Sequence, residues 1–151
     1  MKAFRFRLDQ ALRWRATQVD IEKAAAASAA SRLAGIREEA ESLRQSLTGS
    51  ALELASGATG ESLKSWSAWR DRTRRRIVEL EGKEQEARKA LDDQMQRLLE
   101  ANRKQRLLEK LREGEQARWQ ADFGRELEAF ASEVFLGRLQ SKSGRARSSG
   151  G

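Results

Sequence analysis

The sequence predicts an all-α protein: a long antiparallel two-helix coiled-coil hairpin with a C-terminal helical overhang and a disordered basic tail. Three observations predict this fold. The 151-residue chain contains no Pro, which would break the hydrogen-bond ladder of a helix. Two separate stretches carry apolar residues at alternating steps of three and four, the spacing of a coiled-coil seam. A short segment rich in Gly and Ser separates them, as a turn requires.

The first helix is expected at about residues 8–56, where one seam runs without error. Its positions are Leu8, Leu12, Arg15, Val19, Glu22, Ala26, Ala29, Leu33, Ile36, Ala40, Leu43, Leu47, Ser50 and Leu54. Eleven of these fourteen positions are apolar, which favours a coiled coil over a generic amphipathic helix. The stretch 24–30 is rich in Ala, so a partner helix can approach closely there.

The turn is expected at about residues 57–60. Gly57 suits a helix C-terminal cap, and Thr59 suits the N-cap of the next helix. A break at Gly49 is the alternative that the sequence leaves open. The second helix then covers about 61–139, on the order of 110 Å at ~1.5 Å per residue. Its seam consists of Ile77, Leu80, Ala87, Leu91, Leu98, Ala101 and Leu108.

The two seams agree on one register. If the turn centres near Ala58, the numbers of facing residues add up to about 116 or 117 in an antiparallel pair. Ser50 then faces Trp66, Ala26 faces Leu91, and Leu8 faces Leu108. The helical hairpin is expected to form one domain over residues 1–139, followed by a disordered tail at 140–151.

Beyond Leu108 this register leaves an overhang of the second helix, residues 111–135, without a partner helix. The overhang is apolar along one stripe, which includes Trp119, Phe123, Leu127 and Phe130. Exposed rows of large apolar residues normally mark a partner surface.

Composition excludes several function classes. Without Cys or His, the chain has no disulfide, no thiolate and no imidazole base or ligand. We predict no catalytic residue, no cofactor and no metal site, and therefore a protein that is not an enzyme. No apolar run is long enough to span a bilayer and no signal peptide is visible, so we expect a cytoplasmic protein. The net charge of +7 is concentrated in residues 1–15 and 138–151.

Two features near the turn suggest a binding tip. Trp66 and Trp69 are three residues apart; Trp66 is expected to fill the seam, leaving Trp69 partly exposed as a docking residue. The basic run 70–76 follows, with Arg70 and Arg72. Such a run either forms a solvated face that orients the tip or binds nucleic acid through its phosphates.

The chain resembles the flagellar FliJ family. Its opening, with Phe4, Phe6, Leu8, Leu12 and Arg15, is similar to the start of that family. The stretch 103–113, followed by Trp119 and Glu126, is similar to the family's C-terminal motif. Length, hairpin position and basic tail also agree, so the resemblance covers nearly the whole chain. Injectisome stalk proteins of the YscO type are a related group that the sequence does not distinguish.

The resemblance implies a component of the flagellar type III protein export apparatus, needed for flagellum biogenesis and motility. It implies a stalk and general chaperone that docks in a hexameric export ATPase (FliI-like), contacts an export gate protein (FlhA-like) and handles export chaperones. The expected location is the cytoplasmic face of the inner membrane. The ATPase-docking residues would be Phe4, Arg5, Phe6, Arg7, Arg15, Arg106, Lys110, Arg112, Trp119, Phe123, Leu127 and Phe130, and the gate-docking tip would be Trp66, Trp69, Arg70 and Arg72.

Two rival functions come from other classes. A basic helical hairpin that binds nucleic acid would show an affinity that falls steeply with salt. A homodimerising cytoskeletal rod would show a mass that depends on concentration.

Overall fold

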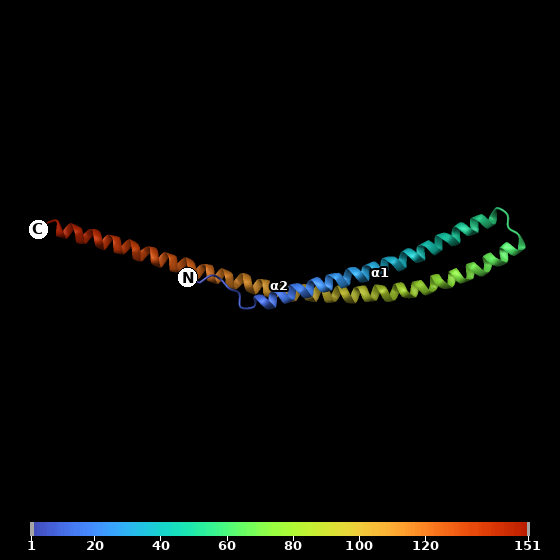
Figure 1. Ribbon diagram of the computed structural model, residues 1–151, viewed down its shortest axis with the longest axis horizontal. Helices are drawn as coiled ribbons and strands as arrows, with labels where there is room; N and C mark the ends of the chain where they lie inside the picture. The colour runs from blue at the N-terminus through green and yellow to red at the C-terminus, as the bar shows by residue number, and fades with distance from the viewer. Residues whose placement is uncertain (1, 151) are drawn as a thin grey trace. The chain divides into compact units, whose positions relative to one another are not determined.

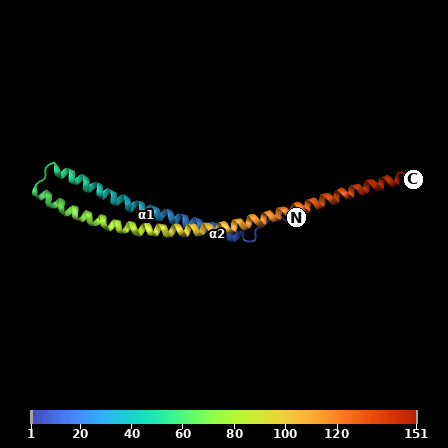
Figure 2. The same cartoon turned by 180° about the vertical axis from the view of Figure 1, so that it is seen from behind.

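The computed structural model describes residues 2–150 and contains two long helices packed against each other, with no strand in that range (Figures 1 and 2). Helix α1 covers Asp9–Ala55 and helix α2 covers Gly60–Ser148. The all-helical prediction is therefore confirmed. Met1 and Gly151, the outer ends of the predicted hairpin and tail, lie outside the described residues.

The chain divides into two compact units, each containing parts of both helices. The hairpin body is Arg15–Lys104, and the terminal unit combines Met1–Trp14 with Gln105–Gly151. The sequence predicts one domain over residues 1–139 and gives no sign of this division.

The predicted seams form the buried surface. All fourteen seam positions of the first helix and all seven of the second are buried or half-buried. The deepest apolar residues of the hairpin body are Val19, Ala26, Leu33, Ala40, Ile77, Leu80 and Ala87. Small Ala side chains alternate with larger ones along this surface, which lets two narrow stripes interlock without a third layer.

Polar contacts within the hairpin body fix the register. The indole Nε1 of Trp66 donates a hydrogen bond to Ser50 Oγ at 3.0 Å, which confirms the predicted Ser50–Trp66 pair. Gln94 Nε2 donates to the backbone oxygen of Glu22 at 3.3 Å and also contacts the Glu22 carboxylate. Because Glu22 precedes Ser50 whereas Gln94 follows Trp66, the two helices run antiparallel in this unit.

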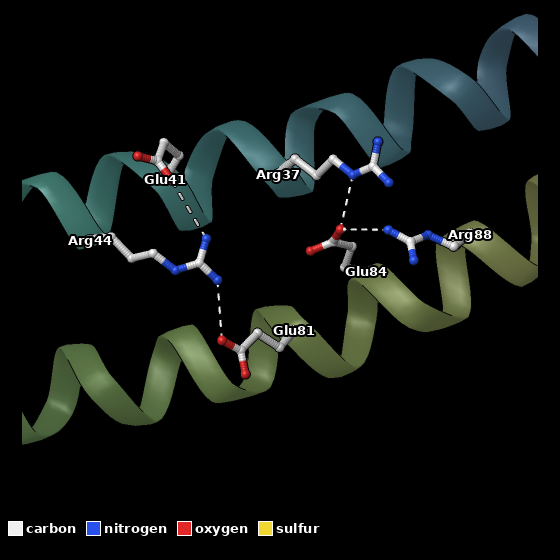
Figure 3. A network of polar contacts seen from close by, with 6 residues as sticks. All are labelled: Arg37, Glu41, Arg44, Glu81, Glu84 and Arg88. Carbon is white, nitrogen blue, oxygen red and sulfur yellow. Dashed lines mark hydrogen bonds and ion pairs between the residues drawn. The ribbon is translucent and has the colours of Figure 1, made fainter.

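Ion pairs cross between the helices beside the seam (Figure 3). Arg37 Nε lies 2.9 Å from Glu84 Oε1, and Arg44 Nη2 lies 3.1 Å from Glu81 Oε1. Glu84 also accepts a bond from Arg88 on its own helix at 3.3 Å. Apart from Glu84, these side chains are about half exposed, and solvent-accessible pairs of this kind contribute about 0.2–1 kcal/mol each. They favour this register more than they stabilise the fold.

The turn lies where the Gly and Thr residues predict it. Gly57 has a φ of 139°, a backbone conformation that favours Gly, and it follows the last turn of α1. Thr59 caps α2, because its hydroxyl accepts a bond from Ser62 N at 3.4 Å and its carbonyl accepts one from Leu63 N at 3.1 Å. Gly49 lies inside α1, so the alternative turn position is wrong.

The structure does not show the disordered tail expected at 140–151. Helix α2 continues nine residues past its expected end at Leu139, to Ser148. The prediction weighed the Ser and Gly content, but Ser141 and Ser143 donate their hydroxyls to helix carbonyls one turn earlier, at 2.9 Å each. No Pro interrupts the backbone hydrogen bonds of the helix in this segment. Arg145 and Arg147 also suit the negative end of the helix dipole.

Leu80 provides the sharpest test of the seam because it is 1% exposed. Replacing Leu80 with Ala removes buried methyl groups and leaves a cavity, so we expect a loss of about 2–5 kcal/mol in the free energy of unfolding, measured by urea titration. The matched control is Leu99→Ala on the same helix, at a position 65% exposed, where the change should stay within about 0.5 kcal/mol. Equal losses for both variants would contradict the packing described here.

The register is also testable by disulfide trapping. Ala26 and Leu91 lie between the Glu22–Gln94 and Ser50–Trp66 contacts along the two helices. We expect the Ala26→Cys, Leu91→Cys variant to form an intramolecular disulfide under mild oxidation, which needs Cβ atoms about 4 Å apart. The control, Ala26→Cys with Ala101→Cys, places the second Cys almost three turns away and should stay reduced. Crosslinking of the control pair would mean that the helices slide.

Candidate functional site

An aromatic cluster joins the start of the chain to α2 within the terminal unit. Residues 2–6 have no regular secondary structure and run beside α2 (Figures 1 and 2). The Phe4 ring lies 6.1 Å from the Trp119 ring, and Trp119 stacks on Phe123 with centroids 5.4 Å apart and planes 4° from parallel. Phe6 is buried at 7% exposure, and its carbonyl accepts a bond from Asp9 N at 3.2 Å. Phe4 thus packs against Trp119, one of the residues of the predicted stripe.

Charged residues border this cluster. A shallow groove is lined by Lys2, Ala3, Phe4, Arg5, Glu115, Arg118, Trp119 and Asp122. A second hollow brings Arg5 and Phe6 close to Arg112. The mixed signs of these charges suit a protein partner better than a single anion. The acidic side, Glu115 and Asp122, could not be predicted from the charge pattern, because the termini stand out only by their basic excess.

The other basic residues predicted for ATPase docking are not part of the aromatic cluster. Arg106 forms ion pairs with Glu109 at 3.2 Å and Glu113 at 3.6 Å, so its charge is shared within α2. Arg7 and Lys110 are exposed. Arg15 belongs to the hairpin body and is half-buried in α1.

The remainder of the predicted stripe is free of packing within the described chain. Leu127 is 52% exposed and Phe130 is 66% exposed. Every residue from Arg125 to Gly150 is exposed. We call Trp119, Phe123, Leu127 and Phe130 the docking stripe; its first two members pack on each other, and its last two face solvent.

The residues predicted for the tip lie together in the hairpin body. Trp66 is half-buried, with its N–H bound to Ser50, and the Arg70 guanidinium lies over its ring at 5.0 Å from the centroid. This confirms that Trp66 fills the seam. Trp69 is half-buried and therefore keeps part of its ring accessible, and Arg72 is exposed.

Two of the five arginines in the basic run 70–76 form ion pairs with acidic neighbours. Arg70 lies 3.4 Å from Asp71, and Arg76 lies 3.0 Å from Glu39 of α1 and 3.2 Å from Glu79. Hydrogen bonds to Glu39 and Glu79 raise the pKa of Arg76, and the bond from Arg76 lowers the pKa of Glu79. Arginines that already have carboxylate partners are less available to phosphates.

No group of three acidic, His or Cys side chains in residues 2–150 could hold a metal ion. No helix in that range is both long and apolar enough to cross a membrane.

Comparisons with known proteins identify no relative. No protein family, no curated protein and no solved structure matches the chain.

Proposed function

We propose that the chain is a stalk-like component of the flagellar type III protein export apparatus, similar to the FliJ family, and does no chemistry of its own. In this proposal an antiparallel coiled-coil hairpin carries an overhang that docks in a hexameric export ATPase. The tip around Trp69 contacts the export gate, and the protein also handles export chaperones. It acts at the cytoplasmic face of the inner membrane.

The observation that carries the proposal is the docking stripe. An aromatic cluster at Trp119 continues into Leu127 and Phe130, which are more than half exposed. A single helix depends on packing for its stability, so an apolar stripe on an unpaired segment calls for a partner. Residues resembling the family's conserved motifs border this stripe, and a ring of subunits that encloses a helix end would cover it on several sides.

Nucleic-acid binding is less well supported. It would need a continuous basic surface, whereas Arg70 and Arg76 have acidic partners and the body of the chain is nearly balanced in charge. An injectisome stalk remains compatible with every feature described.

ATPase docking can be tested without disturbing the fold. Leu127→Glu together with Phe130→Glu changes only exposed side chains, so helicity and unfolding should stay at wild-type values. We expect the double variant to lose co-purification with the export ATPase, because buried charges without partners are costly in an interface. The control, Met95→Glu with Leu99→Glu, alters two apolar residues that are 49% and 65% exposed and lie outside the 103–113 stretch, and it should retain binding. Wild-type affinity of the Leu127, Phe130 variant would exclude the stripe as the docking surface.

The tip makes a separate prediction. Trp69→Ala should leave the melting temperature nearly unchanged but weaken binding to a gate protein by about 2 kcal/mol, roughly thirtyfold, as for a docking aromatic. Trp66→Ala is the contrast, since it removes the Ser50 bond and the ring under Arg70 and should lower stability. Titration calorimetry and thermal unfolding measure the two effects. A strong loss of stability in Trp69→Ala would assign Trp69 to the core instead.

A further inference from the structure

The end of α2 carries a second apolar surface beyond the docking stripe. Phe135, Leu136 and Leu139 are 63%, 58% and 49% exposed. Leu139 lies four residues after Phe135 and three after Leu136, so the three side chains gather on one side of the helix. The proposed ATPase docking leaves this cluster without a role.

Basic residues border the cluster. Arg138, Lys142 and Arg145 follow at steps of four and three, which places them on one stripe, and Lys142 comes three residues after Leu139. Arg147 lies eleven residues after Leu136, about three turns, and so borders the other edge. No acidic residue occurs between Glu133 and the end of the chain. Since α2 is helical to Ser148, these residues have defined faces that a disordered tail would lack.

We propose that residues 134–148 of α2 form an interfacial helix that binds the surface of an anionic lipid bilayer. Large apolar side chains bordered by Lys and Arg are the composition of helices that lie in a membrane surface. The apolar cluster enters the boundary between headgroups and acyl chains, and the basic stripes contact lipid phosphates. Four positive charges without an acid select a negative surface.

Lipid fits these residues better than nucleic acid does. The phosphates of a nucleic acid would pair with the basic side chains but would leave Phe135, Leu136 and Leu139 in water. A bilayer accommodates both parts of the segment at once. The expected binding is reversible, because each Lys or Arg side chain near an anionic leaflet raises the partition coefficient only about fivefold.

The test uses the full chain and vesicle flotation at low salt. Vesicles contain either phosphatidylcholine alone or equal parts of phosphatidylcholine and phosphatidylglycerol. We expect the wild-type chain to float with the anionic vesicles and not with the neutral ones. Arg138→Gln with Lys142→Gln should weaken binding by about 25-fold, and Phe135→Gln with Leu139→Gln should abolish it.

Matched controls separate this surface from general effects. Lys89→Gln with Arg103→Gln removes the same charge from exposed positions of the body, and Leu99→Gln with Leu107→Gln removes two exposed leucines; both should bind as wild type. Because Leu127 and Phe130 are unchanged in every variant, ATPase association should persist, so failure of one proposal does not imply failure of the other.

Three results would overturn the proposal. No flotation of the wild type with anionic vesicles would assign the surface to a protein partner. Unchanged binding by the Phe135, Leu139 variant would reduce the effect to adsorption through net charge. The third result is binding of the wild type to a DNA duplex that weakens to the same extent when Arg138 and Lys142 are replaced but not when Phe135 is replaced. This result would identify a phosphate-binding surface.

Discussion

The structure depends on one interaction, the packing of two narrow apolar seams against each other. A single amphipathic helix in water is marginal, and most of its stability comes from the surface that it buries. Here that surface is only one stripe wide, with Leu80 and Ala40 as its most buried apolar residues. Each turn therefore draws its stability from the turns directly opposite, and segments without a facing helix rely on their intrinsic helix propensity. The exposed end of α2 is such a segment, which is why its apolar residues point to partners outside the chain.

Polar residues in the seam make its register specific. A repeating apolar stripe could slide by a heptad with little change in burial. Sliding would separate Trp66 from Ser50 and Gln94 from Glu22, and would leave polar groups without partners at half-buried positions. The polar contacts thus contribute less to total stability than to the choice among similar pairings.

Much of this arrangement could be predicted because a period of three and four residues encodes both the helix and its buried face. The seam from Leu8 to Leu54, the turn at Gly57 and the Ser50–Trp66 pair all follow from such local rules. The helical state of residues 140–148 could not be predicted. The Ser and Gly content of this segment does not reveal that the hydroxyls of Ser141 and Ser143 donate hydrogen bonds to helix carbonyls. The tilted contact between the Phe4 and Trp119 rings could not be predicted, because it depends on the three-dimensional path of a segment without periodicity. The acidic side of the groove at Glu115 follows from the same path. The surroundings of the basic run near the tip could be predicted only in part, because the carboxylate partners of Arg76, Glu39 and Glu79, come from both helices.

The free part of α2 carries two different surfaces in series, the docking stripe ending at Phe130 and the basic apolar cluster that begins at Phe135. Both require the same backbone to be helical, although nothing in the described chain packs on it from Arg125 onward. A partner on either surface would hold the helix in place and reduce the conformational entropy that the second partner must remove. If both proposals hold, ATPase and membrane would therefore favour each other's binding without touching, through a shared ordering of one helix. The coupling would depend on the helix running unbroken through residues 131–134, which separate the two surfaces and contain neither Gly nor Pro.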